Sequence, residues 1–503
     1  MKKSFINYII FAASLALATG CKPGDFGDLN VSPNSPAKPV TSLMLTSAER
    51  YMGRTTAVTS VATVPGVIND YAAKLYTQQI SEMLYTSESR YATKIYNYSG
   101  VFNSPLEDLA LIIKLNTDEL TKSAPNVVNN GSNKNQIAVA RILKAFYFQN
   151  MTDRWGDIPY SESLQGMALI TPKFDRQKDV YNALFKELKE AAAGFDSGAM
   201  AAGDFLFDGD QNKWKIFAAT IRMNMALRLS KVDPALGKTE FNLALAEGVI
   251  SSNADNIVYQ FLSDSSNENN IYYNYEVNKR YDYAISNTMV DALAAIADPR
   301  LPVYADKNID GLYVGMPYGL TQEDAGKGFS SGNVSSPGSV SLIGKAFRSQ
   351  NSPVRIYTYA ETMFSKAEAY KLGWITGAPD DAQAEIAYLA GIKASMDQNG
   401  VTAPAGYYLQ AGVAYNAGDA VKQIITQKWM TNYMGYAAEA WSDWRRTGFP
   451  TLTPTPFAEN IGKQIPVRQC YSNDEPSLNN KNYQDMLSIQ GPDELSTPVW
   501  WDK

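Results

Sequence analysis

The spacing of apolar residues is the feature of this sequence that most limits its fold. From Leu43 onward, apolar side chains recur every three or four residues through much of the chain. This spacing gathers them on one face of an α-helix, whereas a half-buried strand would need strict alternation. The sequence therefore predicts a mainly α-helical protein. The clearest helices are expected at residues 135–152, 180–193, 213–229, 241–250, 357–374, 381–399 and 420–433.

Several of these helices have similar lengths and carry small residues where neighbours could approach closely. In the helix expected at 357–374, Ala360 and Ala367 share a face with Phe364 and Tyr370. Paired helices of this kind are typical of tetratricopeptide repeats, whose period is about 34 residues. The sequence has no clean repeat at that period, so we expect a tetratricopeptide-like scaffold of helix pairs from helix length and spacing alone.

Three short motifs are interpreted as structural. In DRWGDIPY, Gly156 should end a helix, and Trp155 offers a large apolar surface that is most often core. In WSDWRRTG, Asp443 and Arg446 have the spacing of an ion pair on a helix, worth about 0.5 kcal/mol if exposed. The closing pair Trp500–Trp501 is expected to pin the carboxy terminus to the body.

Two long blocks, 85–103 and 255–352, interrupt the helical pattern. Both are polar and turn-prone, and neither contains tryptophan. Loops longer than about 15 residues in compact domains are usually functional or disordered, and the tyrosine content of these blocks favours order. We therefore expect them to form a binding face. The candidate rings are Tyr85, Tyr91, Tyr96, Tyr98, Tyr272, Tyr273, Tyr275, Tyr281, Tyr283, Tyr304, Tyr313 and Tyr318.

The ligand site is expected where the two blocks meet, with Arg90, Tyr91, Tyr275 and Tyr283 as members. Tyrosine offers a flat apolar face with a hydroxyl at its tip, which suits wet contacts with sugars or peptides. Helical packing does not explain this density of tyrosine, although local packing stays the commoner role of any single ring. The polar neighbours that would bond a ligand are Asn274, Asn278, Arg280 and Asp282.

The absence of histidine limits what chemistry the chain can perform. Nucleophilic catalysis through a serine–histidine or cysteine–histidine pair is excluded, as are the common histidine-containing zinc sites. A carboxylate pair for glycoside hydrolysis needs only two acids about 5 to 10 Å apart. With 51 acidic residues some pair will meet that condition, and no motif singles one out, so we expect no enzymatic activity.

A calcium loop is a second candidate site. Asp306, Asn308 and Asp310 match the opening D-x-N-x-D-G of a calcium loop of the EF-hand type, with Gly311 at the sharp turn. The twelfth position holds Pro317 in place of the usual bidentate glutamate. A bound calcium ion and a plain turn are therefore both open readings of this segment.

The first residues form a processing signal. Two lysines precede an apolar run that is too short for a comfortable bilayer span, which needs about 20 residues, and Ala18-Thr19-Gly20 leads to Cys21. We interpret residues 1–20 as a lipoprotein signal peptide and Cys21 as the lipidated residue. Residues 21–40, rich in proline and asparagine, then form a tether. Cys470 is left without an intrachain disulfide partner.

Charge excludes another class of partner. The chain has 45 basic and 51 acidic residues, a formal net charge of −6, and no basic tract of the kind that follows a phosphate backbone. Nucleic acid is therefore not an expected ligand.

Longer segments resemble the SusD/RagB family. One begins at Ala145 and contains DRWGDIPY, and another begins at Gly209 and reads GDQNKWKIFAATIRMNMALRLSKVDP. The carboxy-terminal part, with WSDWRRTG and the closing TPVWWDK, is similar to the same family, as is the lipoprotein start followed by DFGDLNVSPNSP. The resemblance covers essentially all of the chain after Cys21, and DRWGDIPY and WSDWRRTG are its most specific parts.

The resemblance implies a single α-helical domain over residues 41–503, with long loops that shape a binding face. Members sit on the surface of Bacteroidetes-type bacteria as lids over a TonB-dependent outer-membrane transporter of the SusC type, and they bind oligosaccharides or oligopeptides. The expected function is therefore nutrient capture at the outer membrane. A surface adhesin or assembly factor is the alternative, because a helical scaffold serves protein binding equally well.

Overall fold

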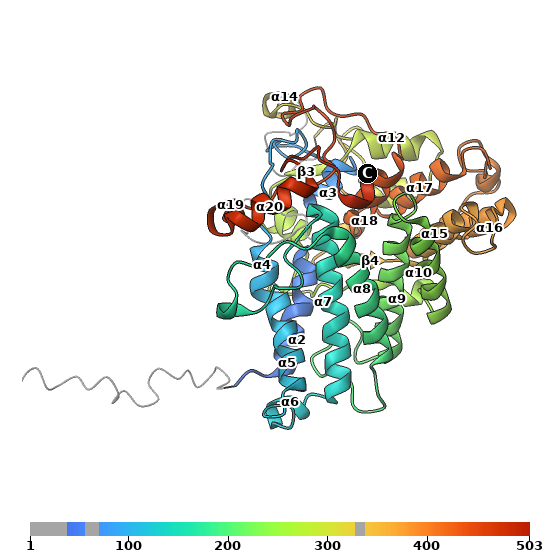
Figure 1. Cartoon of the computed structure of the whole chain (residues 1–503). Coiled ribbons are helices and arrows are strands. Elements are labelled where there is room, and N and C mark those ends of the chain that lie inside the picture. The colour runs from blue at the N-terminus through green and yellow to red at the C-terminus, as the bar shows by residue number, and fades with distance from the viewer. Residues whose placement is uncertain (1–37, 56–69, 327–337) are drawn as a thin grey trace, which may run out of the picture.

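A row of packed helices forms the scaffold of the protein (Figure 1). The computed structural model describes residues 38–55, 70–326 and 338–503. Within them α7 packs between α5 and α8, α8 packs against α9, and α9 packs against α10. The bounds of these helices are α5 (Glu107–Thr117), α7 (Asn133–Trp155), α8 (Gln177–Ala193), α9 (Gln211–Arg228) and α10 (Pro234–Glu247).

Three further helices join this row by a contact with α9. The helix α15 contacts α9 and packs against both α16 and α17. Their bounds are α15 (Tyr359–Lys371), α16 (Asp381–Gln398) and α17 (Ala420–Thr431), close to the ranges expected from the sequence. The mainly helical fold built from paired helices is therefore confirmed.

Local signals set the ends of these helices. The side chain of Ser132 caps α7 by accepting a hydrogen bond from the backbone N–H of Asn135 at 3.1 Å, and Gly156, with φ 85°, ends that helix. The expected start of α10 at residue 241 was wrong. This helix begins at Pro234, because the Asp233 side chain caps it and proline suits a first helical position.

Arginines on α9 are buried and do not form a solvent-facing stripe. Arg222 pairs with Glu240 of α10 at 2.8 Å. Arg228 pairs with Asp153 of α7 at 2.8 Å and with Glu439 at 2.7 Å. The polar positions of this helix therefore join neighbouring helices, because each buried guanidinium has carboxylates beside it.

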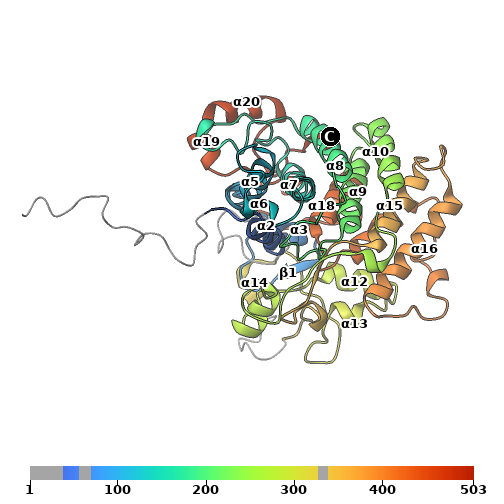
Figure 2. The same ribbon diagram turned by 90° about the horizontal axis from the view of Figure 1, so that it is seen from below.

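Two short antiparallel sheets join distant parts of the chain. Strand β1 (Ile80–Glu82) pairs with β3 (Tyr283–Ile285), and β2 (Ile257–Tyr259) pairs with β4 (Val354–Tyr357). The first sheet brings the two tyrosine-rich blocks together. Figure 2 shows β1, α12 (Asn287–Ala295), α13 (Leu301–Tyr304) and α14 (Gln322–Gly326) on one side of the molecule and α19 (Asp474–Leu478) and α20 (Asn480–Gln490) on the opposite side.

Helical segments inside the second block correct the expectation that it is free of helix. Besides α12, α13 and α14 it contains α11 (Asn270–Tyr272), which continues into a π-helical turn at Tyr273–Val277. The first block ends similarly, with α4 (Ser99–Val101) running into a π-helical turn at Phe102–Leu106. The other α-helices of the described residues are α2 (Thr41–Thr55), α3 (Tyr71–Tyr76), α6 (Pro125–Val128) and α18 (Ala437–Thr447).

The structural readings of the three short motifs are confirmed. Trp155 and Trp501 are buried in the largest hydrophobic cluster. Arg446 pairs with Asp443 at 2.9 Å, but both side chains are buried, and Glu368 and Lys428 complete the group. The pair is therefore part of the core, where loss of one partner costs more than at the surface.

Candidate functional site

The four residues chosen from the sequence do not form an open binding surface. Tyr91 is fully buried and packs edge-on against Tyr76, with ring centroids 6.0 Å apart. Arg90 is partly exposed, but its guanidinium pairs with Glu459, and its Nε donates to the carbonyl of Thr86 at 3.1 Å. These two residues hold the first block against the body.

Tyr275 and Tyr283 are core residues. The hydroxyl of Tyr275 donates a hydrogen bond to the main-chain carbonyl of Tyr283, and the ring of Tyr283 packs against Tyr71 with centroids 4.7 Å apart. Burial raises the pKa of both phenols above the ordinary value. The expectation that Tyr91, Tyr275 and Tyr283 stack on a ligand is therefore corrected, because their rings are enclosed by protein in this structure.

The two blocks do meet, and their junction exposes a different set of side chains. The backbone N–H of Met83 donates to the carbonyl of Asp282 at 2.8 Å, which extends the pairing of β1 and β3. Just beyond this pairing the ring of Tyr85 is 57% exposed. The guanidinium of Arg280 lies 5.4 Å from its centroid, within the range of a cation–π contact.

Asp282 holds this arrangement in place. Its carboxylate pairs with Arg280 at 2.9 Å and accepts a hydrogen bond from the side-chain amide of Asn274 at 2.8 Å. Tyr281, half-buried beside them, packs edge-on against the enclosed ring of Tyr275 at 5.0 Å between centroids. We name this group the Tyr85 surface. Its members are Tyr85, Asn274, Arg280, Tyr281 and Asp282.

The Tyr85 surface combines an exposed aromatic ring with an exposed guanidinium, which the buried carboxylate of Asp282 holds in place. A flat ligand that carries hydroxyl or amide groups could stack on the ring and exchange hydrogen bonds with its neighbours. The sequence placed Tyr85 and Arg280 among the wider candidates. It could not single them out, because only the pairing of β1 with β3 shows which tyrosines lie beneath the sheet and which lie beyond its end.

The calcium loop forms a turn in which the side chains of Asp306 and Asn308 already have protein partners. The carboxylate of Asp306 pairs with Arg348. The side-chain oxygen of Asn308 accepts from the backbone N–H groups of Asp310 at 3.0 Å and Leu312 at 2.9 Å. Among the described residues no group of three or more histidine, cysteine or acidic residues could hold a metal ion. Calcium at Asp306, Asn308 and Asp310 stays a prediction.

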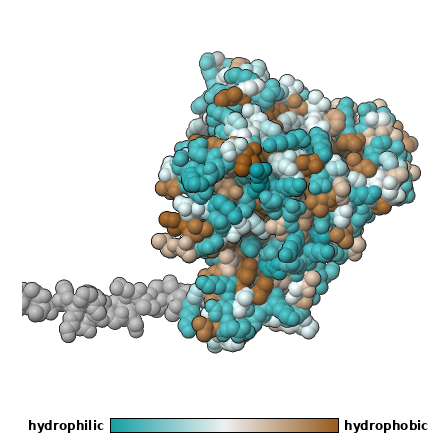
Figure 3. Space-filling view, in the orientation of Figure 1, coloured by the Kyte–Doolittle hydropathy of each residue, from teal (hydrophilic) through white to brown (hydrophobic). Residues whose placement is uncertain are grey.

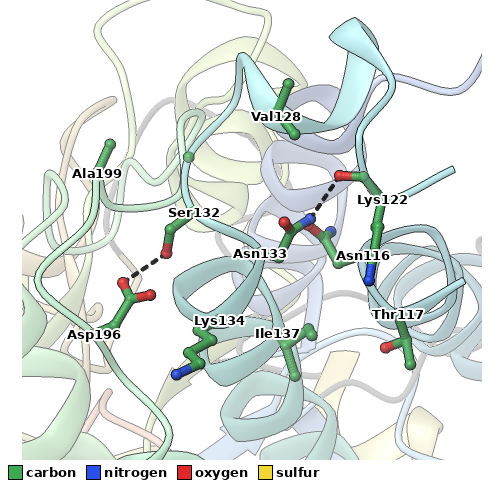
Figure 4. Close-up of a pocket in the computed structure, with 11 residues that line it drawn as sticks. Asn116, Thr117, Lys122, Val128, Ser132, Asn133, Lys134, Ile137, Asp196 and Ala199 are labelled. Carbon is green, nitrogen blue, oxygen red and sulfur yellow. Dashed lines mark hydrogen bonds between the residues drawn. The ribbon is translucent and has the colours of Figure 1, made fainter. Parts of the chain in front are cut away.

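A cavity of about 660 Å³ lies at the end of the scaffold near α6 (Figure 4). Its polar side chains are largely paired with one another. Ser132 donates to Asp196 at 2.8 Å, and the amide of Asn133 donates to Asn116 at 2.8 Å and to the carbonyl of Lys122 at 3.0 Å. With these groups engaged, the cavity offers a ligand fewer hydrogen-bonding positions than its lining suggests.

The predicted lipidation residue, Cys21, lies outside the described residues. In the described part of the chain, no helix combines the length and the apolar composition needed to cross a membrane. Cys470 is buried and is not in a disulfide.

Solved structures of known proteins resemble this chain in fold. A chitin-binding protein is 28% identical, with a TM-score of 0.74, and the alignment covers 92% of this chain and 100% of that protein. A chitin-binding SusD homologue from Flavobacterium johnsoniae is 24% identical, with a TM-score of 0.73 and coverages of 92% and 98%. A SusD homologue from Bacteroides fragilis is 21% identical, with a TM-score of 0.73 and coverages of 92% and 100%.

A comparison with curated proteins found no match. A family model described as "Starch-binding associating with outer membrane" matches residues 33–472, which is most of the chain and includes both tyrosine-rich blocks. The chain therefore belongs to the SusD-like family of starch-binding proteins that associate with the outer membrane.

Proposed function

We propose that this protein captures oligosaccharides on the Tyr85 surface and does not alter them chemically. The observation that carries the proposal is the exposed ring of Tyr85 beside a guanidinium that Asp282 orients. Sugars present an apolar ring face and a rim of hydroxyls, so they match an aromatic platform edged by hydrogen-bonding groups. The family description and the chitin-binding relative support a glycan over an oligopeptide.

Calorimetric titration tests this placement of the site. The ligands are chitooligosaccharides, maltooligosaccharides and a mixture of short peptides, each titrated into the wild type and into Tyr85→Ala and Arg280→Ala variants. An aromatic stacking contact is worth about 0.5 to 1.5 kcal/mol, so Tyr85→Ala should weaken glycan binding by about two- to tenfold. Arg280→Ala should weaken it as well, because the guanidinium both donates hydrogen bonds and packs on the ring.

Tyr408 provides the matched control. It is a half-buried tyrosine beside Tyr407, remote in sequence from both blocks, and its ring packs edge-on at 5.7 Å. Tyr408→Ala should leave glycan affinity unchanged. Glycan binding that ignores both the Tyr85 and Arg280 changes would place the site elsewhere, and binding of peptides alone would replace the proposed ligand class.

The absence of catalysis is tested on the same samples. No histidine is available, so hydrolysis would have to use a carboxylate pair. Prolonged incubation with each bound glycan should yield no shorter products by chromatography. Release of shorter sugars by the wild type, lost on mutation of an acidic residue, would contradict the proposal.

We further propose that the protein is a surface lipoprotein that delivers its ligand to a TonB-dependent transporter of the SusC type. The family's association with the outer membrane supports the location. Mild detergent extraction of native membranes, followed by affinity purification of this protein, should recover a barrel transporter in stoichiometric amount. If this protein is purified without any transporter, the alternative of a surface adhesin or assembly factor would be favoured.

A further inference from the structure

A groove that is separate from the Tyr85 surface lies on the side of the molecule opposite to the first sheet and α14 (Figure 2). It is a groove of about 570 Å³ whose walls are α5, the loop between α7 and α8, and α19. We name it the α5 groove. Its lining includes Phe102, Asn103, Glu107, Ala110, Leu111, Lys114, Leu164, Gln165, Leu169, Ile170, Asp474 and Leu478.

One wall is a continuous helix face. Glu107, Ala110, Leu111 and Lys114 are spaced three, four and seven residues from the first, so they lie along the same side of α5. The apolar pair sits between a carboxylate at the start of this face and an ammonium group at its end. The wall therefore offers an apolar centre with a charge on either side.

The facing loop and α19 carry apolar side chains that protrude into solvent. Met167, Ile170 and Leu478 are 92%, 72% and 75% exposed, respectively. Figure 3 shows apolar residues gathered at the edge of the molecule where Figure 1 draws this loop. Contiguous exposed apolar surface on a soluble protein usually marks an interaction site. The apolar area here extends beyond the groove itself, as a protein contact would require.

Four polar side chains of the groove are free to bond a partner. Asn103, Glu107, Lys114 and Gln165 make no side-chain hydrogen bond or ion pair within the described residues. Lys114 is the single cation of the described lining, while Glu107 and Asp474 are both exposed carboxylates. The rim is therefore net acidic, and it complements a basic partner.

The walls do not resemble a sugar platform. They are chiefly aliphatic, and the one partly exposed ring, Phe102, makes edge-on contacts with Tyr98 and Phe148 at 5.8 and 6.1 Å between centroids. Aliphatic walls instead suit the side chains of a polypeptide, whose backbone the amides of Asn103 and Gln165 could bond. This contrast separates the α5 groove from the Tyr85 surface.

We propose that the α5 groove binds a polypeptide segment of a partner protein, one that carries aliphatic side chains next to basic residues. The apolar side chains would lie against Leu111 and Ile170, and the basic residues would face Glu107 and Asp474. This proposal concerns a protein contact and does not rest on glycan binding at the Tyr85 surface.

Fluorescence anisotropy with two synthetic peptides tests the proposal on the complete protein. One peptide alternates leucine with lysine, and the other alternates leucine with glutamate. The wild type should bind the lysine peptide more tightly. An Ile170→Ser, Leu478→Ser double variant should lose affinity for it by about tenfold or more, because apolar contact area is removed without a change in charge.

Matched variants test whether peptide binding is specific to the groove or arises from nonspecific hydrophobic association. Leu409→Ser removes an apolar side chain that is 84% exposed and lies outside the groove, and it should not change peptide affinity. Glu107→Gln with Asp474→Asn should reduce the preference for the lysine peptide over the glutamate peptide. Tyr85→Ala should leave both affinities unchanged, so a failure of glycan binding at that surface is distinguishable from a failure here.

Three results would overturn the proposal. The first is no binding of either peptide by the wild type, and the second is equal loss of affinity in the double variant and in Leu409→Ser. The third is displacement of the bound peptide by a chitooligosaccharide in the Tyr85→Ala background, which would make the groove a glycan site.

Discussion

The indole N–H of Trp501 donates a hydrogen bond to a carboxylate oxygen of Asp153 at 3.0 Å. The last turn of α7 thereby holds the end of the chain. The same carboxylate pairs with Arg228 at 2.8 Å and accepts a hydrogen bond from the hydroxyl of Tyr181. A buried acid that serves several partners couples the carboxy terminus to the helices α7, α8 and α9.

Removing this bond should destabilise the fold. Trp501→Phe keeps most of the apolar ring but deletes the donor, so we expect the free energy of unfolding to fall by about 1 to 3 kcal/mol in chemical denaturation. The neighbouring Trp500, which is only half-buried and packs on Tyr181 at 5.9 Å, is the control. Trp500→Phe should cost less, and an equal loss in both variants would show that ring size matters more than the bond.

Tyr275 should behave as a structural residue. Its hydroxyl bonds the carbonyl of Tyr283 inside the core, so Tyr275→Phe leaves a buried acceptor without its donor and should cost about 1 to 3 kcal/mol of stability. Glycan affinity of the folded variant should equal that of the wild type, measured by calorimetry. A variant of unchanged stability with weakened glycan binding would instead show that Tyr275 belongs to the ligand site.

The helices could be predicted from local sequence patterns, whereas the candidate site depends on strand pairing between segments that are distant in sequence. Helical spacing, the Ser132 cap and Gly156 all act within a few residues, and α7 and α8 were predicted close to their true bounds. The sequence also indicated that the two tyrosine-rich blocks meet. It could not distinguish Tyr85 from Tyr275, because both have polar neighbours, and only the antiparallel pairing of β1 with β3 buries one and exposes the other.

The buried ion pairs were a second feature that the sequence could not predict. Arg222 and Arg228 have helical spacing that is equally consistent with a solvated stripe and with ion pairs between helices. Their carboxylate partners lie between 18 and 211 residues away in sequence. No local pattern predicts such partners, so the charged core became visible only in the folded protein.

Glu361 should make stability depend on pH. Burial raises its pKa from 4.5 to about 7, despite the nearby ammonium of Lys428 and hydrogen bonds from Thr358 and Asn432, and the carboxylate of Glu439 adds to the rise. The folded state then binds a proton more tightly than the unfolded state. Stability should therefore fall as the pH rises from about 4.5 to 7, and it should be regained on acidification through that window.

A Glu361→Gln variant should flatten this dependence. A shift of this size corresponds to about 3 kcal/mol at most, measured as the difference in unfolding free energy between pH 4.5 and 7.5. Asp502, whose pKa burial also raises to about 7, contributes in the same direction, so part of the slope should persist until Asp502→Asn is added. A slope that neither substitution changes would assign the dependence to other groups.

The membrane anchor is predicted to depend on Cys21 alone. Since no helix in the described part of the chain can cross a membrane, a Cys21→Ala protein should fold normally and yet appear in the soluble fraction of cells. Cys470→Ala is the matched control, because that thiol is buried, with its Sγ 3.4 Å from the carbonyl of Asp493, and it should leave membrane partitioning unchanged. The measurement is the share of each protein that requires detergent for extraction, together with the mass of the mature amino-terminal peptide. A Cys21→Ala protein that still needs detergent would show that another part of the chain, or a tightly bound partner, holds it to the membrane.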